Sequence, residues 1–153
     1  MKTVILIAAA GLAFAAADDE DAKRLPDGSG KDTLVKVCLS CHGTGNFRKL
    51  RLTKEAWSEQ VADMIDRGAE VTDAQGAAVV AYLTQTFGKD SKIYINTAPF
   101  EELKSVLGLS VPETQAVLAY RKEKGDFKSW QDLEKVPGVD PGKIEKKKEL
   151  ILF

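Results

Sequence analysis

The residues best suited to chemistry lie side by side in the segment Cys38-Leu39-Ser40-Cys41-His42. They include both cysteines and the single histidine of the 153-residue chain. On a helix, positions i, i+3 and i+4 share a face. Two thiols at this spacing can bond the two vinyl groups of one porphyrin while the neighbouring imidazole binds its iron. The pattern predicts one haem c, covalently attached to Cys38 and Cys41, with His42 as the proximal iron ligand.

Zinc binding, a redox dithiol and chance placement are the alternatives to haem for this segment. A zinc site needs about four protein ligands, and the chain offers two Cys and one His besides carboxylates. A thioredoxin-like dithiol expects a βαβ context, which the sequence does not show. Chance would place the single His directly after the second Cys in roughly one of 150 arrangements. A disulfide across three residues would also close almost no loop, so it would be a poor structural staple.

The first residues have the features of a secretory signal peptide. Lys2 precedes an apolar run from Val4 to Phe14, which is too short to span a membrane and is followed by three alanines. We expect cleavage after Ala17; the alternative is an uncleaved anchor. The segment predicts a periplasmic or otherwise exported protein, with no membrane-spanning segment in the mature chain.

The distal iron ligand is a separate question. The chain has no second histidine, and Met64 is the only methionine outside the predicted signal peptide. Met64 is therefore the predicted distal ligand, although it also lies on the apolar stripe of its own predicted helix and would serve as core packing. An open site or a Lys or Asn ligand are the other possibilities. His/Met ligation would suit electron transfer, whereas an open site would suit small-ligand binding.

Composition and turn signals suggest a mainly α-helical protein of two small domains. Apolar residues make up 44% and charged residues 29%, and the net charge of −1 excludes a strongly basic coat protein as a description of the whole chain. We predict a flexible lead-in over 18–30, a cytochrome c-like haem domain over 31–90, and a second domain over 91–153. A polar break at 89–92 separates the two domains.

Apolar periodicity predicts three helices in the first domain. The first runs from about Lys31 to Cys41, and the second begins near Thr53. The third begins at Thr72, whose capping box with Gln75 marks its start. An extended segment over 93–96 follows.

The second domain contains an internal repeat at an offset of 30 residues. The matching stretches are Glu101-Glu102-Leu103 with Gln131-Asp132-Leu133, and Val106-Leu107-Gly108-Leu109-Ser110 with Val136-Pro137-Gly138-Val139-Asp140. Each copy is predicted to form helix, tight glycine turn, helix. Ser110 with Glu113 and Asp140 with Pro141 have the pattern of helix N-caps.

Residues 26–87 resemble a small monohaem c-type cytochrome domain. The resemblance rests on Pro26-Asp27-Gly28-x-Gly30-Lys31, the Cys38–His42 motif, Trp57 with Met64, and Tyr82-Leu83. It implies that His42 and Met64 hold the iron, although the interval from Cys41 to Met64 is shorter than is typical of that family. Among the basic residues after the motif, Arg48, Lys49 and Arg51 are candidates for pairing with haem propionates or for a solvated turn.

Residues 93–153 resemble the paired helix-hairpin-helix domain of the periplasmic DNA receptor of natural competence. The matching stretches are Ile95-Asn96-Thr97-Ala98, Glu101-Glu102-Leu103, Ala119-Tyr120-Arg121, Gly125-Asp126-Phe127 and Lys135-Val136-Pro137-Gly138. In DNA-binding members a Gly-apolar-Gly turn offers backbone N–H groups to a phosphate. Here the second glycine is Ser110 in one turn, which still allows a hydroxyl donor. It is Asp140 in the other, where a carboxylate is unfavourable.

The turns and the basic patch beside the second hairpin give six candidate DNA contacts, which are Gly108, Ser110, Gly138, Lys143, Lys146 and Lys147. From residue 91 onward the chain has 11 Lys and Arg and 10 Asp and Glu, which is less basic than a dedicated duplex binder usually is. The lysine cluster, extended by Lys148, is also compatible with a solvated helix face, because Glu145 and Glu149 are interspersed.

Two functional hypotheses follow. The first is an exported electron-transfer cytochrome whose hairpin domain docks it to a redox partner protein or a membrane-associated electron-transfer complex. The alternative is a haem-carrying periplasmic protein that binds DNA through the hairpin domain. No catalytic nucleophile set is apparent, because the sole His and both Cys are assigned to haem, so an enzyme is not expected.

Overall fold

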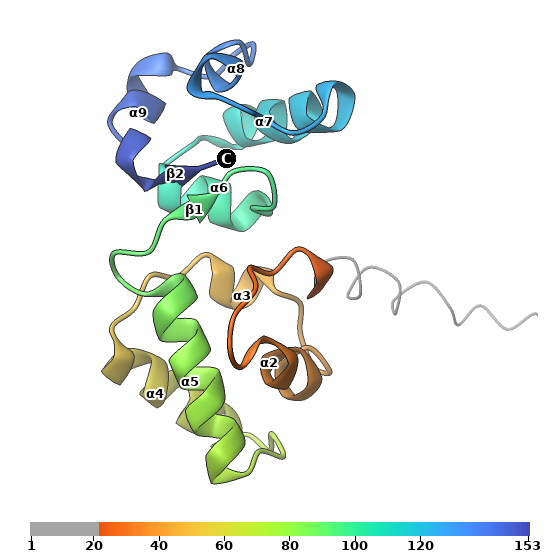
Figure 1. The fold of residues 1–153 in the computed structure, drawn as a ribbon, viewed down its shortest axis with the longest axis vertical. Helices are drawn as coiled ribbons and strands as arrows, with labels where there is room; N and C mark the ends of the chain where they lie inside the picture. The colour runs from red at the N-terminus through yellow and green to blue at the C-terminus, as the bar shows by residue number, and fades with distance from the viewer. Residues whose placement is uncertain (1–21) are drawn as a thin grey trace, which may run out of the picture.

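The computed structural model describes residues 22–153 (Figure 1). The predicted signal peptide, residues 1–17, lies outside this range. Across the described part of the chain, none of the helices has both the length and the apolar character that a membrane crossing requires.

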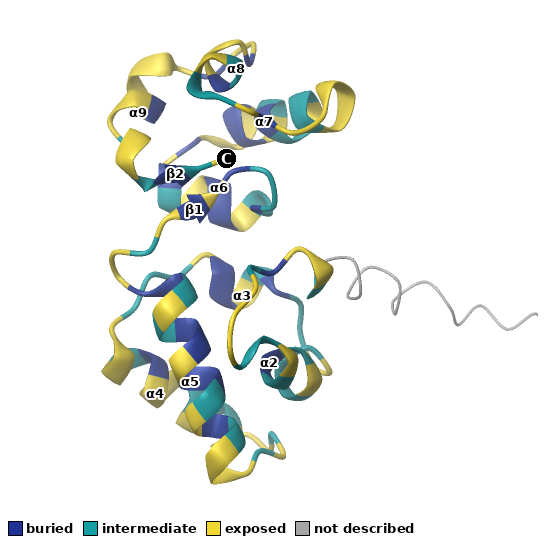
Figure 2. Ribbon diagram, in the orientation of Figure 1, coloured by how far each residue is buried: buried dark blue, intermediate teal, exposed yellow. Residues whose placement is uncertain are grey.

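From residue 31 onward, the N-terminal half contains α2 (Lys31–Cys38), α3 (Gly45–Arg48), α4 (Lys54–Asp66) and α5 (Asp73–Phe87). Helix α5 packs against α2 and α4. Their shared core is made of large apolar side chains, among them Leu34, Phe47, Trp57, Tyr82 and Phe87. In Figure 2 the buried stretches, such as those along α5, are dark blue.

The predicted starts of α4 and α5 are confirmed. The hydroxyl of Thr53 accepts a hydrogen bond from the N–H of Ala56 (3.3 Å), and Thr72 and Gln75 form the complete capping box. These caps satisfy N–H groups that have no partner inside the helix, which is why the local sequence was sufficient to locate them.

The predicted end of the first helix is wrong. Helix α2 ends at Cys38 instead of Cys41, and residues 39–42 form turns in which the N–H of Cys41 donates to the carbonyl of Cys38 (3.4 Å). The chain turns here and enters the short helix α3 at Gly45, a helix that the sequence did not predict. Cys38 and Cys41 are therefore presented by a helix end and the following turn, not by one regular helix face.

The C-terminal half comprises five helices and two short strands. They are β1 (Ile93–Tyr94), α6 (Phe100–Leu107), α7 (Val111–Lys124), α8 (Trp130–Glu134), α9 (Pro141–Glu145), the 3-10 helix η1 (Lys148–Leu150) and β2 (Ile151–Leu152). Strands β1 and β2 pair in parallel, with Ile93 opposite Ile151. The last strand therefore returns to the start of this half and closes it (Figure 1).

The 30-residue repeat corresponds to two helical hairpins, as predicted. Helices α6 and α7 form the first hairpin, and α8 and α9 form the second. Gly108 and Gly138 occupy equivalent turn positions with φ of 70° and 82°, a left-handed conformation that favours glycine. Leu103 and Leu133, also 30 residues apart, are both fully buried in a separate core of this half. The chain is thus mainly α-helical with a paired helix-hairpin-helix unit.

Candidate functional site

A cavity of about 430 Å³ in the N-terminal half brings together all four residues predicted to hold haem. Cys38 comes from the end of α2, Cys41 and His42 from the following turn, and Met64 from α4. Cys38, His42 and Met64 are partly buried, and Cys41 is exposed.

The chemistry of this cavity fits an apolar macrocycle. Its lining is mainly aliphatic and aromatic, with Trp57, Val61 and Leu83 among the residues that contribute, and its volume lies in the range of small-molecule and cofactor sites. No disulfide joins the two cysteines. Burial raises the pKa of the Cys38 thiol, and the neighbouring Cys41 raises it further. The raised pKa keeps the Cys38 thiol protonated near neutral pH, and neither sulfur is engaged in a disulfide.

The zinc alternative finds no support in the same region. Within residues 22–153 no group of three or more His, Cys, Asp and Glu side chains could hold a metal ion. A site made of Cys38, Cys41 and His42 alone would also fall short of the four ligands of a structural zinc centre.

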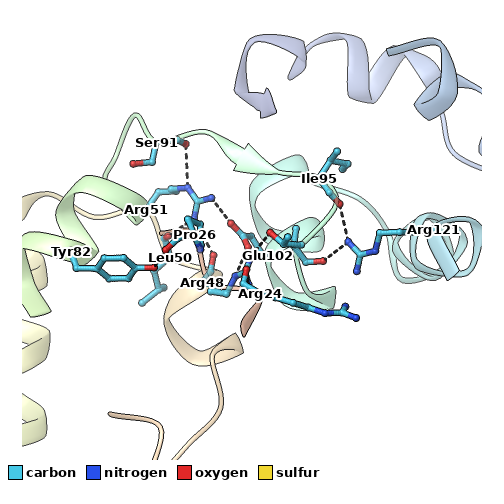
Figure 3. A network of polar contacts seen from close by, with 12 residues as sticks. Arg24, Pro26, Arg48, Leu50, Arg51, Tyr82, Ser91, Ile95, Glu102 and Arg121 are labelled. Atoms are coloured by element: carbon cyan, nitrogen blue, oxygen red, sulfur yellow. Dashed lines mark hydrogen bonds and ion pairs between the residues drawn. The ribbon is translucent and has the colours of Figure 1, made fainter. Parts of the chain in front are cut away.

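Arg48 and Arg51 lie in an ion-pair cluster between the two halves of the chain (Figure 3). Arg48 donates through Nε to Oε2 of Glu102, and Arg51 donates through Nη2 to Oε1 of the same carboxylate, both at 2.7 Å. The side chains of Arg48 and Glu102 are 1% and 2% exposed. The sequence offered propionate pairing or a solvated turn for these arginines, and both descriptions are wrong for Arg48 and Arg51.

This cluster, which we call the Glu102 clamp (Arg48, Arg51 and Glu102), fixes α3 against α6. Both guanidinium groups also lie over the ring of Phe87, at 5.9 and 5.6 Å from its centroid. Further hydrogen bonds run from Arg48 to the carbonyl of Arg24 and from Arg51 to the carbonyl of Ser91. Every acceptor oxygen of the buried carboxylate is thus satisfied, as a buried charge requires.

The two hairpin turns meet at a single carboxylate, that of Glu113. Its Oε2 accepts from the backbone N–H of Ser110 (2.7 Å) and from Nζ of Lys143 (2.8 Å). Its Oε1 accepts from the backbone N–H of Asp140 (3.3 Å). Glu113 and Lys143 are equivalent positions of the 30-residue repeat, so the ion pair joins the two copies and holds their turns side by side.

Ser110 and Asp140 act as N-caps, as predicted. The Ser110 hydroxyl accepts from the N–H of Glu113 (3.4 Å), and Oδ1 of Asp140 accepts from the N–H of Gly142 (2.8 Å). The carboxylate of Asp140 therefore partly occupies the N-terminus of α9, where DNA-binding hairpins offer N–H groups to phosphate. This turn is the less favourable of the two for an anion.

The lysines beside the second hairpin differ in what they contact. Lys143 is engaged with Glu113, while Lys148 lies 3.9 Å from Glu145 and over the ring of Trp130. Lys146 and Lys147 have no ion-pair partner among residues 22–153. Of the four lysines, these two are the ones available to a phosphate backbone.

The ionisation of Glu113 leads to a prediction about pH. The Lys143 ammonium, followed by hydrogen bonds from Ser110, lowers the pKa of Glu113 from 4.5 to about 2. Because the folded pKa lies below the unfolded one, the stabilisation is complete above about pH 5 and is lost as pH falls from about 4.5 towards 2. The difference in free energy of unfolding between wild type and Glu113→Gln should therefore shrink over that interval. A difference that stays constant from pH 5 to pH 3 would contradict this assignment.

Comparison with known proteins bears on the C-terminal half. Residues 88–151 match the family described as "Helix-hairpin-helix motif". This match covers α6 to α9 and the paired turns described above. No solved structure gives a significant match to the chain.

The curated proteins that are similar to this chain include three that match over 63 to 65 residues. ComE operon protein 1 of Bacillus subtilis is 39% identical over 64 residues, which are 42% of this chain and 31% of that protein. An uncharacterized protein of Haemophilus influenzae is 33% identical, over 40% of this chain and 56% of that protein. The mouse endonuclease/exonuclease/phosphatase family domain-containing protein 1 is 34% identical, over 42% of this chain and 11% of that protein. The chain thus spans only part of each relative.

These comparisons correct the main functional hypothesis. The family match is to the helix-hairpin-helix motif, and one of the similar proteins is ComE operon protein 1. None of these findings indicates a cytochrome. The hypothesis of an electron-transfer cytochrome that uses its hairpin half to dock onto a redox partner is therefore wrong for this chain. The DNA-binding alternative fits the findings better.

Two residues of these sites were missed from the sequence. In the sequence Glu102 stands out only as part of the repeat. Its equivalent Asp132 contacts Lys135 at the surface, so the repeat does not indicate a buried clamp. Arg67 lines the cavity beside Met64. Its position three residues after Met64 on a predicted helix was the available signal.

Proposed function

We propose that this chain is an exported, non-enzymatic DNA-binding protein whose paired helix-hairpin-helix half contacts the phosphate backbone of duplex DNA. The observation that carries the proposal is the helix-hairpin-helix match over residues 88–151, with two glycine turns held side by side by Glu113. The similarity to ComE operon protein 1 of Bacillus subtilis over 42% of this chain also supports the proposal.

The arrangement of charges supports contact with phosphates. Glu102 is buried against two arginines from the N-terminal half, so its charge is not presented to solvent. The hairpin half is consequently more positive towards solvent than its sequence count of 11 basic and 10 acidic residues suggests. Lys146 and Lys147 lie just after α9, close in sequence to the second turn, where they can neutralise phosphates without reading bases.

Binding to labelled duplex DNA, followed by fluorescence anisotropy, tests this proposal. For about four phosphate contacts, affinity should fall about 100-fold between 50 and 200 mM salt. Failure to bind at 50 mM salt, or affinity that does not change with salt, would overturn the proposal.

We further propose that the N-terminal half carries one covalently attached haem c in the Cys38 cavity, defined as the cavity lined by Cys38, Cys41, His42 and Met64. The two thiols would form the thioethers, His42 would bind the iron, and Met64 would be its distal ligand. When bound, the group would supply a redox-active iron. The apolar lining and the meeting of these four side chains in one cavity support this proposal.

Expression of the full chain in a bacterium that attaches haem to exported proteins tests the cofactor. We expect haem that stays with the polypeptide under denaturing conditions, and its loss in the double variant Cys38→Ala/Cys41→Ala. Ser40→Ala, at an exposed position inside the motif, is the matched control and should retain haem. A wild-type chain without covalent haem under these conditions would contradict the proposal.

A further inference from the structure

Arg67 is the one lysine or arginine that lines the Cys38 cavity within residues 22–153. It is the C-cap residue of α4 and is exposed. Gln60, Met64 and Arg67 follow one another at spacings of four and three residues along α4, so they share the helix face that meets the cavity. On this face of α4, Met64 is partly buried and Arg67 is exposed to solvent.

The guanidinium of Arg67 has no side-chain partner among the described residues. Arg48 and Arg51, which were candidates for propionate pairing or for a solvated turn in the sequence, both form ion pairs with Glu102. In the described part of the chain, the cavity lining also contains no aspartate or glutamate. Among the lining residues, an anion at the cavity mouth would thus contact the guanidinium of Arg67 and would not be repelled by a carboxylate.

These charges match a ligand that is apolar over most of its surface and carries carboxylates at one edge. We propose that Arg67 binds the propionate carboxylates of the haem and so sets which edge of the macrocycle faces solvent. This inference rests on the proposed cofactor and adds the residue that positions it. A guanidinium and a carboxylate form a charge-assisted, often bidentate pair.

The test combines one protein change with one ligand change. The full chain with reduced thiols is titrated with haemin and with haemin dimethyl ester, which lacks the carboxylates. Quenching of tryptophan fluorescence, to which Trp57 at the cavity wall contributes, reports binding. Wild type should prefer haemin about tenfold or more. Arg67→Gln should abolish this preference, and Arg67→Lys should keep part of it. Arg24→Gln, a matched change at an exposed arginine outside the cavity lining, should leave it intact.

A second measurement uses chains that carry covalent haem. Thermal unfolding of haem-loaded Arg67→Gln should have a lower midpoint than haem-loaded Arg24→Gln. If wild type binds haemin but Arg67→Gln behaves like Arg24→Gln in both measurements, the role of Arg67 is overturned and the haem site stands. If wild type neither binds haemin nor acquires covalent haem, the haem site itself is wrong, and the role of Arg67 falls with it.

Discussion

Replacement of Glu102 by alanine is expected to lower the free energy of unfolding by about 3–5 kcal/mol. The change leaves Arg48, whose side chain is 1% exposed, buried without its counter-charge, and it removes an ion pair between α3 and α6. Urea denaturation of wild type and variant, followed by tryptophan fluorescence, measures the difference.

Glu101→Ala is the matched control, because Glu101 is the exposed neighbour in the same helical turn. Its effect should stay within about 0.5 kcal/mol of zero, as is usual for surface positions. The combined variant Arg48→Ala/Glu102→Ala should be less destabilised than the sum of the two single variants, because the residues form one ion pair. Equal effects of Glu101→Ala and Glu102→Ala would show that the clamp does not stabilise the fold.

Replacement of Lys146 and Lys147 by glutamine is expected to weaken binding to duplex DNA at low salt by at least tenfold. If each lysine neutralises one phosphate, the slope of log affinity against log salt should become shallower by about 1.8. The measurement is a salt series of anisotropy titrations with one duplex. Both lysines lack an ion-pair partner among residues 22–153, so little folding stability should be lost.

Lys122→Gln/Lys128→Gln provides the matched control for charge. Both positions lie away from the hairpin turns, one at the far end of α7 and one in the loop that follows. This variant should retain most of the affinity and of the salt slope. A loss equal to that of the Lys146/Lys147 variant would mean that binding depends on overall charge and not on the hairpin face.

Local features of the fold could be predicted from the sequence because their causes are local. Thr72 with Gln75 and Ser110 with Glu113 satisfy backbone groups within three residues, and Asp140 does so within two. Strand β2 could not be found in this way, since two residues carry no periodicity and their partner strand lies 58 positions earlier. The sequence also did not predict the end of α2 at Cys38, where the chain turns and then enters the short helix α3 at Gly45.

The candidate sites also differ in whether their contacts join residues that are near or distant in the sequence. The spacing of Cys38, Cys41 and His42 predicted one shared environment, and the cavity contains all three. The ion pair between Arg48 and Glu102 joins residues 54 positions apart. The residues next to each of them in the sequence do not indicate this contact. The two roles of Glu113 differ in the same way. Its cap was visible in the sequence, but its contacts with Lys143 and Asp140 appear only when the hairpins pack together.

Amide NMR shifts of the isotope-labelled full chain on addition of duplex DNA most directly test whether the paired hairpins contact DNA. We predict that the shifts concentrate in the two turns around Gly108 and Gly138 and in the Lys146–Lys147 segment. The amides around Glu102 and the Cys38 cavity should change little. Shifts confined to the N-terminal half, or no shifts at a DNA concentration that saturates the anisotropy signal, would contradict DNA binding by the hairpins.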